Sequence, residues 1–418
     1  MVESGGCWRK GEVACRQGLF VRPRFDGRVV FSGLSIRQQM ISASRFIHDT
    51  YTSLQRRLKL ALPLCQECPS TVKIHELQPA GGCKLDTSLE AAFHGYLRQD
   101  VDYDWPEWCC YDIADAILTG DQGFVFLPDG RFFAPSLFPN HERAGLYKIR
   151  RPIRALARKF KGAVFHLTGP NHENRGHFML DHLPRLLAAR GLLSGIGDYQ
   201  ILLTGHHIRW QREHLRMLGF PDDRLIACDA GTLQVERLLH VRFASHQSSI
   251  APPAKLHELR DCAGRYAEAE DQPVGPPVFL TRRDAPNRRL LNEERIFAAA
   301  KSLIPNLIEV KLTGMPLKEQ IRLFRRTPLI LSPLGQASCN IVFSKGCTIL
   351  NLKHGPVPPD ANGSIGTLIA AASGNRGLTI YSGTEMGQNL DWSYDESLFS
   401  GHLARFLEIE KQAGRVYR

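Results

Sequence analysis

The apolar residues of this chain fall into two patterns from about residue 120 onward. Short continuous apolar runs between Gly, Pro or polar residues are typical of buried strands, and apolar residues spaced three or four apart indicate helices. Strands are predicted within 123–133 (two, about a turn), and at 163–167, 200–203, 225–227, 238–243, 278–281, 307–311, 329–332 and 348–352. Helices are predicted at 177–193, 208–218, 254–269, 292–303, 316–326 and 338–344. This alternation predicts an α/β fold with parallel, doubly wound sheets.

A stretch rich in Pro, Gly and acidic residues, 268–277, interrupts the alternation and marks the predicted domain boundary. The chain then divides into an α/β domain at 120–270 and a second at 271–418. Ligands of such sheets bind beyond the carboxyl ends of the strands. We therefore expect two domains that face each other across a cleft.

The first 119 residues show a different pattern. Residues 1–33 are rich in Gly and Arg and read as a loose leader, and residues 63–110 show no lasting periodicity. Between them, residues 35–62 carry apolar side chains at near-helical spacing together with several basic ones. Such a basic amphipathic helix either rests on an anionic membrane surface or packs on the first domain, and we favour packing.

Composition narrows the class of protein. The chain has 418 residues, 43% hydrophobic and 23% charged, which is typical of a globular protein, and its net charge of +11 favours anionic partners. No apolar run approaches the roughly 20 residues of a membrane span, and no signal-peptide core is evident. We expect a cytoplasmic protein, with contact at the inner face of the membrane left open by the basic helix. Aromatic residues are not interleaved with a basic stripe, so nucleic acid is not expected as a partner.

Cysteine usage argues against disulfides and against a metal site. Eleven cysteines is an odd number without framework spacing, so we expect reduced thiols. Cys65 and Cys68 form a single CxxC motif. A zinc site needs a second ligand pair at suitable spacing, and none is evident, so no metal is predicted.

Two segments of the second domain suit phosphate. Four arginines follow the predicted strand 278–281, namely Arg282, Arg283, Arg288 and Arg289. The strand 329–332 leads into a small-residue turn and a helix start that contains Gly335, Gln336, Ser338 and Asn340. Helix N-termini and guanidinium groups both bind phosphate oxygens. Either segment alone is also typical of solvated surface or plain packing, but together they predict a nucleotide or phosphosugar site.

A second set of polar residues suggests acid–base chemistry. His177 and Asp181 are four apart on a predicted helix and therefore share a face, next to a loop that contains His172 and Asn174. A carboxylate beside an imidazole can serve as a general base directly or by orienting the imidazole. A purely structural pair remains the alternative. His182 should point elsewhere, and neither a GxGxxG fingerprint nor a GxxxxGK[ST] loop is present.

Three blocks in this order resemble glycosyltransferase family 61: NHENRGHFMLDHLPRL, TRRDAPNRRLLNEE and PLKEQIRLFRRTPLILSPLGQASCNIVFSKGCTILNL. The resemblance covers about residues 165–355. It implies a GT-B type fold of two Rossmann-like domains, an acceptor-side domain at 120–270 and a nucleotide-sugar-binding domain at 271–418. It also implies an inverting, metal-independent glycosyltransferase with a nucleotide-sugar co-substrate and no other cofactor. Bacterial relatives assemble capsular or other surface polysaccharides, which implies a glycan or lipid-linked acceptor.

The residue patterns and the resemblance together lead us to assign roles to residues. Asp181 is the expected catalytic base, with His177 as its partner or as the base itself. The acceptor side is expected at His172, Asn174 and Arg185. The nucleotide sugar is expected to bind at Arg282, Arg283, Arg289, Asn292, Glu293, Gln320, Gly335, Gln336, Ser338 and Asn340.

Two positions depart from the family pattern. Leu334 stands where the family usually has His, and Asn351 stands where a Glu often closes the following strand. These departures motivate a second hypothesis, a GT-B-like protein that binds a nucleotide sugar or an anionic glycan without catalysis. Slow hydrolysis or transfer of a donor distinguishes the enzyme from the binding protein.

Overall fold

The computed structural model describes residues 64–65, 69–95, 99–120, 122–136, 152–169, 171–204, 208–228, 231–243, 251–270, 274–357 and 364–417. The leader, the basic helix predicted within 35–62 and the second half of the CxxC motif lie outside these residues. Within them, no helix combines the length and the apolar character needed to cross a membrane.

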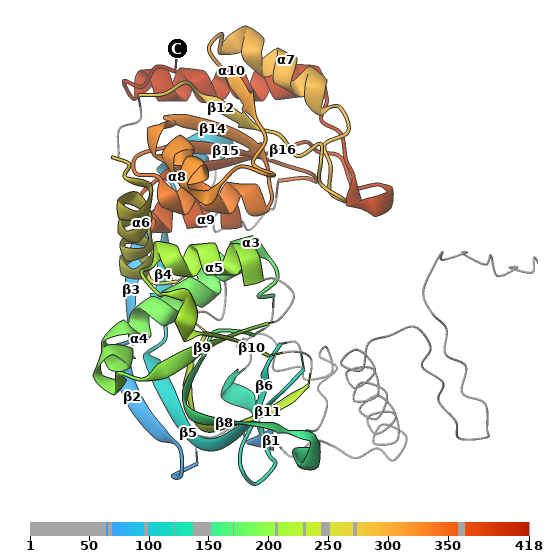
Figure 1. The fold of residues 1–418 in the computed structure, drawn as a ribbon. Coiled ribbons are helices and arrows are strands. Elements are labelled where there is room, and N and C mark those ends of the chain that lie inside the picture. The colour runs from blue at the N-terminus through green and yellow to red at the C-terminus, as the bar shows by residue number, and fades with distance from the viewer. Residues whose placement is uncertain are drawn as a thin grey trace, which may run out of the picture.

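The C-terminal lobe, residues 274–417, is built on a five-stranded parallel sheet (Figure 1). Its order is β13 (Ile308–Val310), β12 (Val278–Leu280), β14 (Leu329–Pro333), β15 (Thr348–Lys353) and β16 (Arg376–Tyr381). Nearly every residue of β12, β14 and β15 is buried, because helices cover both faces of the sheet. One face carries α7 (Glu293–Leu303) and α10 (Glu396–Gln412), and the other carries α8 (Leu317–Arg326), η7 (Gln336–Phe343) and α9 (Ile365–Ala372).

The elements predicted between residues 278 and 352 are confirmed, each with ends within two residues of the prediction. One difference is that η7 is a 3₁₀-helix rather than an α-helix. The order of strands reverses between β12 and β14, so the loops after these two strands lie side by side at the carboxyl edge of the sheet. Ligands of doubly wound sheets bind at such a reversal.

The N-terminal lobe holds a nine-stranded mixed sheet. Its parallel part consists of β11 (Thr232–Val241), β8 (Arg158–His166), β9 (Tyr199–Thr204) and β10 (Leu225–Cys228). The sheet continues through the antiparallel strands β5 (Trp108–Thr119) and β6 (Phe124–Phe126), with β7 (Phe132–Phe133), β1 (Leu64–Cys65) and β2 (Lys73–Gln78) completing it. The prediction of a wholly parallel sheet is therefore wrong for this lobe. The links between β5, β6 and β7 are too short for the helical crossovers that parallel strands require.

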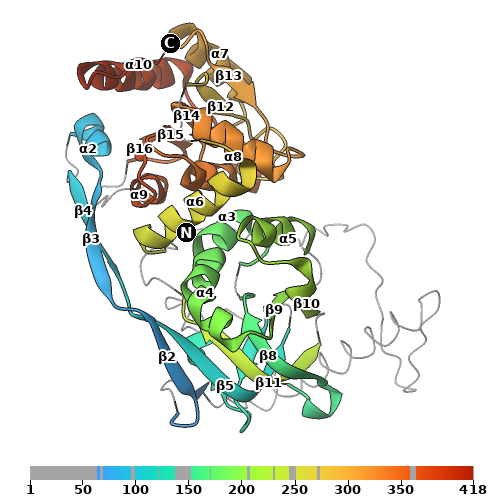
Figure 2. The same cartoon turned by 60° about the vertical axis from the view of Figure 1, so that its left-hand side comes forward.

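Residues 63–110 are not irregular, as the sequence suggested, but supply strands and an arm. β3 (Gly81–Asp86) and β4 (Asp100–Trp105) form a two-stranded ribbon that rises from the N-terminal lobe and carries α2 (Ser88–His94) to the C-terminal lobe (Figure 2). There Leu89 and Phe93 of α2 join the core formed with α10. Glu90 accepts the backbone N–H of Ser364, which precedes α9. These strands escaped prediction because they depend on distant segments: β2 pairs with β5, and β3 contacts α9 of the C-terminal lobe.

The two lobes pack directly on each other. α6 (Pro253–Ala267) contacts α4 (Leu183–Ile196) and α5 (Ile208–Met217) on one side and α8 and η7 on the other. A single cluster of buried apolar residues runs from α4 through α6 into α8 and η7. The fold is thus a mixed α/β structure, with a parallel sheet in the C-terminal lobe and a partly parallel sheet in the N-terminal lobe.

Candidate active site

The His177–Asp181 pair stands at the junction between the lobes. Asn174 caps α3 (Arg175–His177), and its Oδ1 accepts the N–H groups of Gly176 and His177 at 2.9 and 3.3 Å. Asp181 lies in the π-helical turn Phe178–His182 that follows. His177 Nδ1 and Asp181 Oδ2 are 2.7 Å apart, so the predicted pairing is confirmed. Such wide turns are frequent at functional sites.

Asp181 and His177 differ sharply in access. Asp181 is 3% exposed, and burial raises its pKa to about 6 in spite of the hydrogen bond with His177, which lowers it. The His177 side chain is 33% exposed and lines a cavity. Asp181 is therefore placed to orient the imidazole rather than to touch a ligand itself. His182 points away and bonds Leu167 O through Nδ1, as expected.

The cavity at His177, about 300 Å³, is here called the dyad cavity. The N-terminal lobe contributes Asn174 and His177 to its wall, and the C-terminal lobe contributes Gly335 and Ser338. The two lobes touch beside it, because a Cβ on Gly176 would lie 2.8 Å from Cys339 Sγ. The predicted catalytic pair and the predicted phosphate turn are thus brought to one cavity by the packing of the lobes.

Arg282 and Gly335 are in contact, as predicted. Arg282 follows β12, Gly335 follows β14, and a Cβ on Gly335 would lie 1.3 Å from Arg282 Nη1. Burial lowers the pKa of Arg282, and the neighbouring positive charge of Arg288 lowers it further. The buried Nε of Arg282 has no hydrogen-bond partner among the described residues. A half-buried guanidinium at the start of η7, beside a second arginine, is a strong site for an anion.

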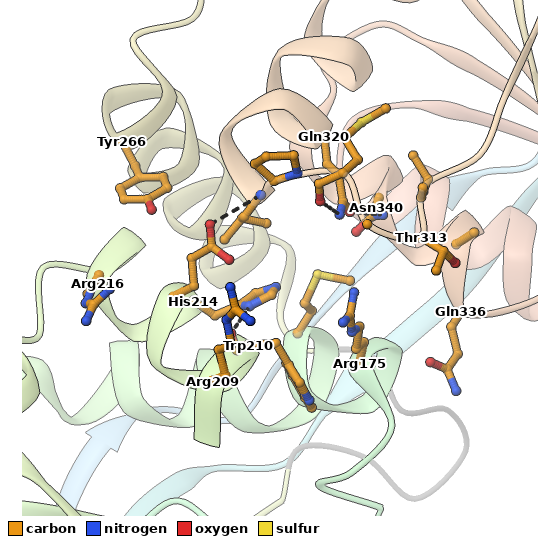
Figure 3. Close-up of a pocket in the computed structure, with 18 residues that line it drawn as sticks. Arg175, Arg209, Trp210, His214, Arg216, Tyr266, Thr313, Gln320, Gln336 and Asn340 are labelled. Atoms are coloured by element: carbon orange, nitrogen blue, oxygen red, sulfur yellow. Dashed lines mark hydrogen bonds between the residues drawn. The ribbon is translucent and has the colours of Figure 1, made fainter. Parts of the chain in front are cut away.

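A second cavity of about 850 Å³, here called the large cavity, also borders η7 (Figure 3). Its wall from the C-terminal lobe is the loop 312–317 after β13, together with Gln320, Gln336 and Asn340. Asn340 Nδ2 donates to Gln320 Oε1 at 3.3 Å, and Gln320 Nε2 donates to Met315 O at 2.8 Å. These amides hold the loop and present polar groups at the carboxyl edge of the sheet.

The opposite wall of the large cavity comes from the N-terminal lobe and is cationic and aromatic. Arg175 stacks over Trp210 at 5.5 Å, and Arg209 lies near them on α5 (Figure 3). No acidic side chain in the described part of the chain forms an ion pair with either arginine. Tyr266, the acidic Glu213 and the neutral His214, whose pKa burial lowers to about 4, also line this side. Gln336 borders both cavities, so the start of η7 lies next to each of them.

Five predicted nucleotide-sugar residues line neither cavity. They are Arg282, which lies against Gly335 as described above, and Arg283, Arg289, Asn292 and Glu293. Arg283 pairs with Glu294 and Glu309, and Arg289 pairs with Asp391 at 2.8 Å. The side chains of Asn292 and Glu293 support the backbone instead. Asn292 bonds the peptide groups of Tyr394, and Glu293 accepts the N–H of Arg282 at 3.1 Å. Glu293 thus fixes the loop that presents Arg282, which is a positioning role.

Of the three residues predicted on the acceptor side, one lines a cavity and two are buried. Asn174 lines the dyad cavity, whereas His172 is 2% exposed and bonds Gly169 O through Nδ1. Arg185 is completely buried, donates to Val241 O at 2.7 Å and stacks over Phe243. The expected contact of His172 and Arg185 with an acceptor is therefore not supported, because both side chains serve the core.

Sequence reasoning overlooked several lining residues. In the dyad cavity these are Lys353, His354 and Trp392, and in the large cavity Arg175, Arg209 and Trp210. Arg288, one of the four arginines that suit phosphate, also lines the dyad cavity. Lys353 and His354 had a usable signal, because they end and follow a strand at the carboxyl edge of the sheet. The residues of α5 had none, because only the packing of the lobes brings that helix to the second sheet. Within the described residues no three His, Cys, Asp or Glu side chains gather as metal ligands would.

Comparison with known proteins agrees with the site geometry. Residues 176–350 match the family model described as Glycosyltransferase 61. The match begins beside His177, includes Arg282 and ends in β15, so it spans both lobes at the candidate site. A search of curated proteins found no match. The family match supports glycosyltransferase family 61 and hence a glycosyltransferase.

Proposed function

We propose that this protein is an inverting glycosyltransferase of the GT-B type that uses a nucleotide sugar. The observation that carries the proposal is the position of Arg282. Its half-buried guanidinium lies against Gly335 at the start of η7, and Gly335 shares the dyad cavity with His177. Transfer from a sugar diphosphate requires a cationic group that stabilises the leaving diphosphate and a base that accepts the proton of the acceptor hydroxyl. Arg282 and the His177–Asp181 pair suit these two roles.

The two cavities suit the two ends of such a donor. The large cavity has room for a nucleoside, with Trp210 and Tyr266 as apolar surfaces and the amides of Gln320 and Asn340 as polar contacts. The diphosphate would lie over the start of η7, where the first N–H groups of a helix have no internal partner. Arg282 is the cation at this point, and it neutralises the leaving diphosphate without need of a metal ion. The sugar then enters the dyad cavity.

His177 is the proposed general base. An inverting transfer is one displacement at the anomeric carbon, in which the acceptor oxygen forms a bond as the bond to the diphosphate breaks. The acceptor hydroxyl gives its proton to Nε2 of His177, while Asp181 holds Nδ1 and stabilises the imidazolium that forms. Asp181 is a positioning residue in this scheme.

The acceptor and the cellular role follow from the family resemblance and the charge of the chain. We propose a glycan or lipid-linked acceptor in the synthesis of a bacterial capsular or other surface polysaccharide. The net charge of +11 suits an anionic acceptor and a cytoplasmic position next to an anionic membrane. Hexosyl or pentosyl transfer both fit the proposal.

The test is a panel of nucleotide sugars incubated with the wild-type protein and with His177→Ala. We expect at least one donor to bind and to be transferred or slowly hydrolysed, and His177→Ala to lower that rate by about 10²–10⁴ without loss of donor binding. His257→Ala is the control, because His257 is a partly exposed histidine that lines neither cavity. Absence of binding by every donor contradicts the proposal. Binding without turnover favours instead the catalytically inactive binding protein that Leu334 suggests.

A further inference from the structure

The dyad cavity has an unusual wall for a sugar site. Most of its lining surface is apolar, and its polar side chains come from the segment around His177, from the start of η7, and from Arg288, Lys353 and His354. The apolar wall is formed by Leu180, Leu334, Leu352, Ile365, Ile369 and Trp392. None of these side chains can accept a hydrogen bond, and only the indole N–H of Trp392 can donate one.

An apolar wall selects against hydroxyl groups that face it. A sugar hydroxyl pressed against this wall loses its water and gains no partner, and unpaired buried polar groups are costly. A methyl group in the same place is favoured, because burying it releases water from both surfaces. The part of the sugar that faces this wall should therefore be apolar.

Leu334 decides whether this wall is apolar. Beneath it lies Asn351, which is 0% exposed, and whose amide nitrogen and oxygen have no partner among the described residues. Leu334 Cδ1 and Asn351 Nδ2 lie 3.1 and 2.6 Å from the point where a Cβ on Gly366 would stand, so the two side chains are neighbours. The unpartnered amide of Asn351 thus lies beside Leu334, which lines the cavity, whereas Asn351 itself does not line it.

We propose that the dyad cavity selects a transferred sugar that bears a methyl group, and that Leu334 is the residue that sets this preference. The methyl group belongs either to an N-acetyl substituent or to a 6-deoxy sugar. This inference rests on the proposed function, because it assumes that a nucleotide sugar places its sugar next to His177.

The experiment compares donors that differ only at the proposed group. UDP-N-acetylglucosamine is paired with UDP-glucose, and GDP-fucose with GDP-L-galactose, and the dissociation constant and hydrolysis rate of each are measured. One methyl group in an apolar pocket gives roughly 10- to 200-fold discrimination. In at least one pair we expect the methyl-bearing donor to bind, or to be hydrolysed, at least about tenfold better than its partner. The pair that shows this difference identifies the source of the methyl group.

Two variants test the role of Leu334. Leu334→His places an imidazole beside the unpartnered amide of Asn351, which can hydrogen-bond to it and support the fold, and should reduce the preference to about threefold or less. Leu334→Met keeps the wall apolar and should retain the preference. Thermal unfolding of both variants confirms that they are folded.

The outcomes separate this inference from the proposed function. Equal use of both members of each pair, or preference for the hydroxylated member, overturns the inference while the glycosyltransferase proposal stands. An equal change of preference in Leu334→His and Leu334→Met overturns the role of Leu334. If no donor of the panel binds at all, both the proposed function and this inference fail.

Discussion

Gly335→Ala tests the proposed anion-binding site, which consists of Arg282 and the start of η7 at Gly335, by adding one methyl group. The φ of Gly335 is 178°, an extended conformation open to any residue, so alanine brings no backbone strain. The new Cβ would lie 1.3 Å from Nη1 and 2.5 Å from Cζ of Arg282. The guanidinium must therefore leave its position, and the substitution removes Arg282 from this site without removing its charge from the protein.

The size of the effect follows from these distances. Non-bonded heavy atoms rest about 3.5 Å apart, so the guanidinium must move by roughly 2 Å. A displacement of this size breaks its hydrogen bonds to a bound diphosphate, and hydrogen bonds to charged groups are each worth about 1.5–3 kcal/mol. At about 1.4 kcal/mol per tenfold, donor binding should weaken by roughly 10- to 150-fold.

A double-mutant cycle identifies the cause. Binding of a nucleoside diphosphate is measured by calorimetry for Gly335→Ala, Arg282→Ala and the double variant. We expect each single variant to bind weakly, and Gly335→Ala to add little once Arg282 is gone. Gly401→Ala is the matched control, because its Cβ meets open space on α10 and should leave binding unchanged.

Two results would refute this reasoning. Wild-type affinity in Gly335→Ala means that the position of Arg282 does not matter for the ligand. If the fold-losses in nucleoside diphosphate affinity of the two single variants multiply in the double variant, the two residues act independently. Arg282 then does not hold the diphosphate at Gly335. Thermal unfolding of each variant separates either result from general loss of structure.

Two further substitutions probe the catalytic pair and the arm. In Asp181→Asn the amide can donate a hydrogen bond to His177 Nδ1, which leaves the imidazole proton on Nε2, so that His177 can no longer act as the base. We expect kcat to fall by about 10²–10⁴, while calorimetry shows unchanged donor affinity. A parallel loss of donor affinity contradicts the positioning role of Asp181. Glu90 is 1% exposed, and burial raises its pKa. A carboxyl with a raised pKa stabilises the fold only while protonated, and this stability is lost as the pH rises through the folded value. Glu90→Gln should therefore raise the Tm by a few degrees at pH 7.5 and not at pH 4, and an equal gain at both values argues against a buried charge.

The positions of the strands and helices between residues 278 and 352 followed from the sequence, because each has a local pattern of apolar residues; α9, β16 and α10 were not predicted. Strands such as β14 are short apolar runs, and helices such as α8 carry an apolar stripe at the expected spacing. The His177–Asp181 contact was predictable for the same reason, since a spacing of four places two side chains on one helix face. The contact between Arg282 and Gly335 followed from the rule that carboxyl ends of parallel strands share an edge.

Tertiary structure decided which arginines reach the site, and Arg288, which lines the dyad cavity, is one of them. Arg282 faces Gly335, whereas Arg289 is paired with Asp391, more than a hundred residues later in the chain. The four arginines look alike in the sequence, because the acidic partners that neutralise some of them lie on other elements. The same reason explains the burial of Arg185, whose partners are backbone carbonyls of neighbouring strands.

The arrangement of the lobes was also decided only in three dimensions. The antiparallel half of the first sheet, the arm that carries α2 to the second lobe and the wall that α5 gives to the large cavity all depend on contacts between distant segments. Local periodicity reports which face of an element is buried and not what covers it. The sequence by itself therefore determined the chemistry available to the site, and the packing of the two lobes determined which side chains reach it.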